Sequence, residues 1–215
     1  DADGTEKDLP EISFTKKKLT KKYGNADYKY EVTTNSTGKV VYRSSNTAVA
    51  EPDQFGYITI KKAGSCTITA RVAADANYKS ASAGYQLVVS KKDMTKKKVK
   101  LSKTSYIYAG KNCKPKAVVS GLARSDYKVT YKNADKPGTA ICVITGKGNY
   151  SGKIEVPYSI NLAKTVITKI TNKKSGVSLT WKKVAGAKGY RIYRRTKNGS
   201  WKRIRELTSS KKVSF

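Results

Sequence analysis

Apolar and polar residues alternate in short runs along most of the chain. In the first ninety residues, the clearest runs are Tyr28–Val32, Val40–Tyr42, Tyr57–Ile60, Cys66–Val72 and Tyr85–Val89. A period of two predicts half-buried β-strands, and a spacing near ten residues is typical of a β-sandwich or barrel. No stretch has the periodicity of an amphipathic helix. The pattern therefore predicts an all-β fold.

Similar runs continue in two further blocks. They are Lys116–Val119, Tyr127–Tyr131, Ala140–Ile144 and Ile154–Ile160 in the second block, and Val177–Trp181, Tyr190–Arg195 and Trp201–Ile204 in the third. A lysine-rich stretch over 91–104 marks the first boundary, and the second falls near Asn161. We predict an acidic, poorly ordered lead-in over 1–11 and three β-domains over 12–90, 91–161 and 162–215.

The first two blocks share a weak internal similarity. Ala76-Asn77-Tyr78 near the end of the first block resembles Gly148-Asn149-Tyr150 near the end of the second. Each trio follows a strand that begins at a Gly-Ser or Gly-Thr pair, at residues 64 and 138. The pattern predicts two related β-sandwich units in tandem.

Positive charge rises along the chain. The 215 residues carry 45 Lys and Arg against 15 Asp and Glu, a formal net charge of +30. Residues 1–90 hold 13 basic and 10 acidic side chains, whereas 162–215 hold 16 and 1. This gradient favours an anionic partner such as a glycan or a cell-wall polymer. The alternative is that lysine keeps exposed strands soluble and unpaired.

The residue inventory argues against catalysis. Histidine is absent, which excludes Ser-His-Asp and Cys-His pairs and His-ligated metals. Cys66, Cys113 and Cys142 are too far apart for a zinc ribbon or a Cys-x-x-Cys site. Glu155 and Glu206 stand alone, so no carboxylate pair for glycoside hydrolysis is evident. We predict a non-enzyme without cofactor or metal, and no apolar run is long enough to span a membrane.

The third block contains a candidate ligand-binding surface. Strand alternation places three of its residues on one outward face, and the returning strand adds three more: Arg191, Tyr193, Arg195, Trp201, Lys202 and Arg203. Arginine with aromatic residues suits phosphate, sulfate or carboxylate groups, and a tryptophan suits a sugar ring. The alternatives are a solvated sheet face and a half-buried Trp201 that covers the sheet.

Two cysteines of the second block are a candidate disulfide. Cys142 alternates with inward residues, and Cys113 opens a strand that could lie opposite it. The alternative is two buried thiols that act as small hydrophobic side chains. Cys66 is predicted to be a buried, inert thiol.

The three blocks also resemble known families. The first resembles group 2 bacterial immunoglobulin-like domains through Tyr42–Ala50, Gly56–Ile58 and Lys62–Ala70. The second is similar to a surface repeat of gut Clostridia through Tyr127–Asn133, Gly138–Ala140 and Gly146–Gly152. The third looks like the first half of a fibronectin type III domain through Leu179–Trp181 and Gly186–Arg194. These resemblances imply spacers, stalks and adhesive modules of Gram-positive surface proteins, with no shared catalytic site.

The third block is short for a complete sandwich. Residues 162–215 are fewer than the roughly 100 residues of a typical sandwich domain. We therefore expect Trp181, Tyr190 and Ile192 to lack a covering sheet, unless another segment completes it. A fragment of a longer protein is the favoured explanation.

Together these features predict a monomeric array of β-sandwich domains that is extracellular, wall-associated or secreted and acts as a spacer or adhesive. One alternative is a binding module for a host glycoprotein (mucin or immunoglobulin), a glycan or an anionic wall polymer. Another is the accessory region of a larger extracellular enzyme. The near balance of charge in the first block argues against a nucleic-acid partner.

Overall fold

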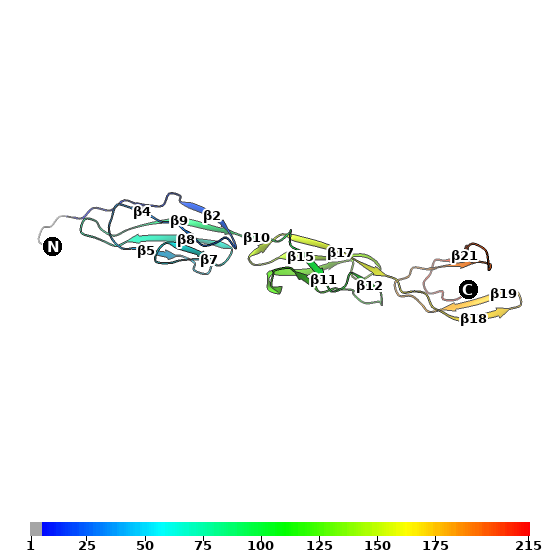
Figure 1. Ribbon diagram of the computed structural model, residues 1–215. Helices are drawn as coiled ribbons and strands as arrows, with labels where there is room; N and C mark the ends of the chain where they lie inside the picture. The colour runs from blue at the N-terminus through cyan, green and yellow to red at the C-terminus, as the bar shows by residue number, and fades with distance from the viewer. Residues whose placement is uncertain (1–5) are drawn as a thin grey trace. The chain divides into compact units, whose positions relative to one another are not determined.

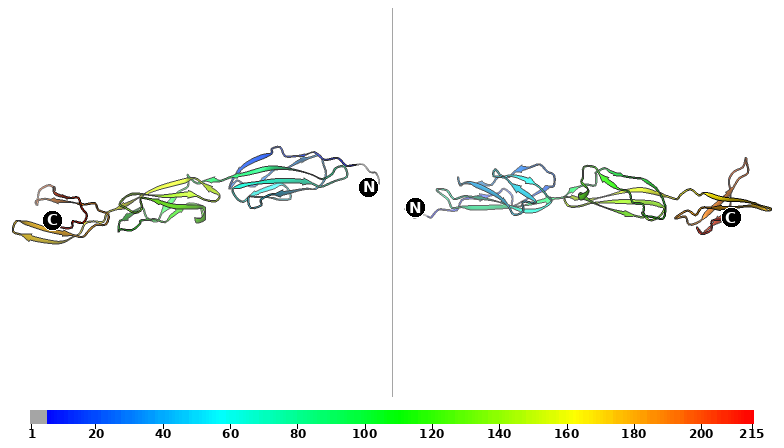
Figure 2. Two further views of the ribbon diagram at one scale, coloured as in Figure 1. Left: turned by 180° about the vertical axis from the view of Figure 1, so that it is seen from behind. Right: turned by 90° about the horizontal axis from the view of Figure 1, so that it is seen from below.

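The structure, a computed structural model, describes residues 6–215 and confirms the all-β fold (Figures 1 and 2). Within these residues the only helix is a single 3-10 turn, Arg124–Asp126. The chain packs into two units. The first contains residues up to 96 with 123–128 and 145–153, and the second contains 97–122, 129–144 and 154–215.

The first unit is built on a four-stranded sheet with the order β2-β9-β8-β5. Its strands are β2 (Lys18–Lys22), β9 (Ala81–Ser90), β8 (Gly64–Val72) and β5 (Val40–Ser44). A three-stranded sheet has the order β3-β7-β6, with β3 (Tyr28–Lys29), β7 (Tyr57–Ile60) and β6 (Ala50–Pro52). Two short pairs complete the unit: β1 (Ile12–Ser13) with β4 (Thr33–Thr34), and β10 (Lys92–Asp93) with β16 (Tyr150–Ser151).

The core of the first unit lies between these two sheets. Ile68 and Leu87 from the larger sheet and Ile58 from the smaller one are fully buried and belong to one apolar cluster. Each such side chain contributes about 1.5–3 kcal/mol by leaving water. The alternation seen in the sequence therefore does divide each strand into a core face and a solvent face, as the burial of β8 shows.

The first and last long strands of this unit pair in parallel. The register runs from Lys18 opposite Gln86 to Lys22 opposite Ser90. Only Leu19 among the five residues of β2 is apolar, which is why the alternation pattern did not predict this strand. Its lysines suit an edge position, because charged edges resist pairing with another chain.

The second unit contains a four-stranded sheet with the order β12-β17-β15-β14. The strands are β12 (Ser105–Ile107), β17 (Lys153–Asn161), β15 (Gly138–Gly146) and β14 (Tyr127–Lys132). Again the first strand of the sheet pairs in parallel with the last, from Ser105 opposite Ser159 to Ile107 opposite Asn161. A short antiparallel pair joins β11 (Val99–Leu101) to β13 (Ala117–Val119).

Two hairpins form the C-terminal part of the second unit. They are β18 (Ile167–Lys173) with β19 (Gly176–Trp181), and β20 (Tyr190–Arg194) with β21 (Lys202–Leu207).

The expectation that the apolar residues of these hairpins lack cover is wrong for Trp181 and Ile192. They are only 5% and 9% exposed and cluster with Leu207, with Tyr190 packed against them. The C-terminal residues also extend the sheet, because the Trp181 N–H donates to the Val213 carbonyl at 2.9 Å. Another segment of the chain thus covers this small core.

The predicted lead-in lies partly outside the described residues, which exclude 1–5. Within it, Asp8 forms a parallel bridge with Tyr78, and the Asp8 carbonyl accepts a hydrogen bond from the Lys79 N–H at 2.9 Å. Pro10 is buried. Residues 8–10 therefore belong to the fold of the first unit.

Candidate functional surfaces

The predicted C-terminal surface lies on the β20–β21 hairpin, and all six of its residues are exposed: Arg191, Tyr193, Arg195, Trp201, Lys202 and Arg203. Tyr193 lies opposite Arg203 in the hairpin register. The Arg195 guanidinium lies 4.9 Å from the centre of the Trp201 ring, and 61% of Trp201 is exposed. The half-buried alternative for Trp201 is therefore wrong. Arg195 and Trp201 form a solvent-exposed cation–π pair.

Glu206 neutralises part of this surface. Its carboxylate accepts hydrogen bonds from Arg191 Nε at 3.2 Å and from Arg203 Nη1 at 3.0 Å. Exposed ion pairs of this kind contribute less than about 1 kcal/mol to stability, but they fix the direction of both guanidinium groups. Arg195 and Lys202 form no ion pair with any described residue, so they carry the unpaired charge of this surface.

The predicted disulfide is not formed in the structure. Cys113 and Cys142 are buried free thiols, as is Cys66. The Cys113 thiol donates instead to the Lys111 carbonyl at 3.6 Å. Burial raises the pKa of the Cys142 thiol, and burial also raises the pKa of Cys66. Desolvation favours the neutral thiol at Cys66 and Cys142. All three cysteines are buried free thiols in this structure, as the buried-thiol alternative describes.

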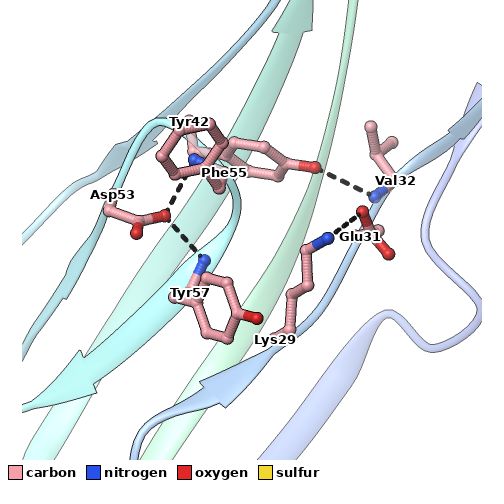
Figure 3. Close-up of polar contacts among 7 residues, drawn as sticks. All are labelled: Lys29, Glu31, Val32, Tyr42, Asp53, Phe55 and Tyr57. Carbon is pink, nitrogen blue, oxygen red and sulfur yellow. Dashed lines mark hydrogen bonds and ion pairs between the residues drawn. The ribbon is translucent and has the colours of Figure 1, made fainter.

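A turn that the sequence reasoning missed presents two exposed aromatic residues (Figure 3). It joins β6 to β7, and Phe55 and Tyr57 are 63% and 49% exposed. The Asp53 carboxylate accepts hydrogen bonds from the backbone N–H groups of Phe55 at 2.8 Å and Tyr57 at 2.9 Å. The sequence signal that could have identified this turn is Asp53-Gln54-Phe55-Gly56, in which two turn-forming residues, Asp and Gly, flank a bulky apolar one.

Neighbouring residues hold this turn in place. Gly56 has φ +82° and lies under the Tyr42 ring, where an added Cβ would be 3.0 Å from Tyr42 Cζ. The Tyr42 hydroxyl in turn accepts a hydrogen bond from the Val32 N–H at 3.3 Å. The Lys29 ammonium pairs with Glu31 at 2.6 Å and lies 5.7 Å from the centre of the Tyr57 ring (Figure 3). Phe55 in the turn and Tyr57 at the start of β7 are therefore exposed on a constrained segment.

The described residues hold no cluster of three or more potential metal ligands. Residues 6–215 contain no helix of the length and apolar character needed to cross a membrane.

Comparisons with known proteins gave solved structures of low similarity and one family model. The solved structures similar to the chain include a SusE-like surface-located polysaccharide-binding protein from the heparin utilisation locus of Bacteroides thetaiotaomicron (13% identity, TM-score 0.27, 71% of this chain and 34% of that one). They also include the protocadherin GammaB4 extracellular domain (10% identity, TM-score 0.32, 94% and 44%) and the surface layer protein SbsC (11% identity, TM-score 0.22, 86% and 27%).

The chain spans less than half the length of each of these three structures. Comparison with curated proteins gave no match. One family model does match part of the chain: residues 14–75 are similar to the intimin immunoglobulin-like domain.

Proposed function

We propose that the chain is a load-bearing spacer of an extracellular surface or secreted protein, built from tandem immunoglobulin-like domains over 12–90 and 91–161, followed by a fibronectin-type module. The match of residues 14–75 to an intimin immunoglobulin-like domain supports the surface location. The shared strand order of the two four-stranded sheets supports the tandem repeat, since each has its first strand parallel to its last.

The parallel pairing of β2 with β9 is the observation that carries this proposal. Two parallel strands run in the same direction, so the chain enters the pair at Lys18 and leaves it at the opposite end, at Ser90. Tension between these two points loads all five residue pairs in shear at once. An antiparallel hairpin loaded at its open end would instead break one pair at a time. The topology thus suits a protein that transmits force along its length.

The ladder also shows which backbone groups carry the load. The Gln86 N–H donates to the Lys17 carbonyl at 2.9 Å, and the Tyr23 N–H donates to the Ser90 carbonyl at 2.9 Å. In a parallel ladder, alternate residues of a strand donate to the same neighbour. Lys21 therefore directs its N–H toward β9. Thr20, the next residue in the alternation, directs its N–H away from β9, and no other strand lies on that side because β2 is an edge strand.

Single-molecule stretching of the full chain tests the proposal. Lys21→Pro removes a ladder donor and should lower the unfolding force of the first domain clearly. Thr20→Pro places the same ring one residue earlier without removing a ladder donor, and it should retain most of that force. Lys21→Ala controls for loss of the lysine side chain, whose ammonium lies 4.1 Å from the centre of the Tyr28 ring.

The segment from Lys18 to Ser90 is 73 residues and spans about 250 Å when fully extended, which identifies its unfolding step. The proposal is wrong if the two proline variants unfold at the same force, or if the unmodified domain yields at the force of an ordinary hairpin.

A second function, adhesion, is favoured by the exposed Arg195–Trp201 pair at the β20–β21 hairpin. We propose that the six predicted residues contact a glycan or a host glycoprotein: Arg191, Tyr193, Arg195, Trp201, Lys202 and Arg203. Loss of glycan-array binding in Trp201→Ala, with retention in Lys197→Ala in the loop that joins β20 to β21, would support this role. Equal binding by both variants would exclude it.

A further inference from the structure

Three basic side chains gather on the solvent face of the sheet β2-β9-β8-β5. Lys39 precedes β5, Arg43 lies within it, and Arg71 lies in β8. All three are exposed. They share a face because strand residues alternate between core and solvent, and the residues next to them, such as Ala70 and Val72, are buried.

The strand register places small residues between these cations. Arg71 lies opposite Ser82 on β9, and Thr69 lies opposite Gly84, which has no side chain. The result is a hollow of about 640 Å³ on this face. We call it the basic hollow and define it by the residues that give it polar character: Lys39, Arg43, Thr69, Arg71, Ser80 and Ser82.

The charge in the basic hollow is uncompensated. No carboxylate lines it, and Lys39, Arg43 and Arg71 form no ion pair with any residue between 6 and 215. Arg71 Nη2 donates a hydrogen bond to Ser80 Oγ at 3.2 Å, which directs the guanidinium along the hollow. The first ninety residues are almost balanced in charge, so this cluster is not a by-product of a basic composition.

The nearest acid in the sequence is engaged elsewhere. Asp75 follows the loop residue Ala74, but its carboxylate accepts hydrogen bonds from the Ser36 hydroxyl at 2.7 Å and the Thr37 N–H at 2.9 Å. These bonds, with those from the backbone of Asn77 and Tyr78, hold the pKa of Asp75 well below its usual range. Asp75 therefore acts as a structural acceptor and leaves the cations of the hollow unpaired.

The spacing of the cations indicates the size of the ligand. Lys39 and Arg43 are four residues apart in an extended strand, about 13 Å. Arg71 lies between them on the adjacent strand, opposite Val41. A single small anion cannot span that distance, whereas a polymer with repeated anionic groups can.

The lining also indicates the chemistry of the ligand. The hydroxyls of Thr69, Ser80 and Ser82 can exchange hydrogen bonds with sugar hydroxyls. No aromatic ring lines the hollow, so it offers no platform for stacking of nucleic-acid bases. We propose that the basic hollow binds an acidic polysaccharide, with its sulfate or carboxylate groups on Arg43, Arg71 and Lys39. This site is separate from the load-bearing strand pair and does not depend on it.

Binding of defined polysaccharides to the full chain tests the proposal. The probes are dextran sulfate, polygalacturonate, neutral dextran and single-stranded DNA, which separate sulfate, carboxylate, uncharged sugar and nucleic acid. The hollow variant carries Lys39→Gln, Arg43→Gln and Arg71→Gln. The control variant removes three exposed lysines elsewhere in the first unit, Lys16→Gln, Lys17→Gln and Lys62→Gln, so both variants have the same net charge.

We expect one or both acidic polymers to bind, with at least about tenfold weaker affinity in the hollow variant and less than about twofold change in the control. Circular dichroism checks that both variants remain folded. Equal weakening in the two variants would reduce the effect to net charge and overturn the proposal. Absence of acidic-polymer binding, equally tight binding of neutral dextran, or tighter hollow-dependent binding of single-stranded DNA would also overturn it.

Discussion

The aromatic cluster around Tyr85 supports a prediction that separates ring packing from hydrogen bonding. Tyr85 lies in β9, is 1% exposed, and meets Phe14 and Tyr30 edge to face with ring centres 4.8 and 4.9 Å away. Its hydroxyl is 3.3 Å from the hydroxyl of Tyr28. Phe14 lies just before β2 and Tyr30 just after β3, so the cluster packs this N-terminal part of the unit against β9.

The two parts of the side chain contribute different amounts. Each edge-to-face pair contributes about 0.5–1.5 kcal/mol beyond area burial. Tyr85→Leu should therefore lower the free energy of unfolding by about 2–4 kcal/mol, once loss of the hydroxyl contact is included. Tyr85→Phe keeps both ring contacts and should lower it by only about 1 kcal/mol. The loss in free energy of unfolding in the double variant Tyr85→Leu, Phe14→Leu should differ by about 1 kcal/mol from the sum of the two single losses, because both substitutions remove the same ring contact.

Urea unfolding followed by tyrosine fluorescence and hydrogen exchange measures these differences. Tryptophan fluorescence does not report on this unit, since Trp181 and Trp201 both lie in the second. Equal costs for Tyr85→Leu and Tyr85→Phe would refute the reasoning, because they would show that ring packing contributes nothing at this position.

Two further predictions concern the turn before β7 and the second unit. Asp53→Ala removes the acceptor for the N–H groups of Phe55 and Tyr57. We expect it to lower the free energy of unfolding by about 1–2 kcal/mol and to speed amide hydrogen exchange at both residues. Asp53→Asn keeps an acceptor oxygen and should retain most of the protection from exchange. Burial raises the pKa of Tyr158 to about 12, and its hydroxyl donates to the Cys113 carbonyl at 2.6 Å. A raised pKa means that the folded state favours the neutral phenol, so this stabilisation is complete below about pH 10 and is lost as the pH rises toward 12. Tyr158→Phe should cost about 1 kcal/mol at neutral pH and make the alkaline loss of stability shallower; an unchanged alkaline slope in thermal melts would contradict this.

Much of the fold could be predicted from local patterns. Alternation identified the strands β5, β7, β8 and β9, because most of their core-facing positions are apolar, as at Ile68, Ala70 and Val72 in β8. It missed β2, where the sequence Lys-Leu-Thr-Lys-Lys offers one apolar residue. Residues Lys18–Lys22 form a strand because they pair with β9 rather than because of an apolar pattern of their own, so period-two alternation has little to detect there.

The two candidate binding surfaces differ in how far the sequence alone could predict them. Arg191 and Tyr193 are two residues apart in one strand, so their common exposed face follows from periodicity alone. The basic hollow joins Arg43 to Arg71 through the register of β5 and β8, and register between strands distant in sequence cannot be read from either strand. The same limit applies to the parallel pairing of β2 with β9.

The burial of Trp181 shows how long-range contacts changed another expectation. Its cover comes from Val213 and from Ile192 and Leu207 of the second hairpin, and these long-range contacts leave no local sequence pattern.

Force applied in two directions to the first domain tests the load-bearing account most directly. Handles at Lys18 and Ser90 load the parallel β2–β9 pair in shear, whereas handles at Ser65 and Ser90 pull β8 from β9 at the open end of an antiparallel pair. The account predicts a clearly higher unfolding force for the first direction at the same pulling speed. Equal forces in the two directions would contradict it.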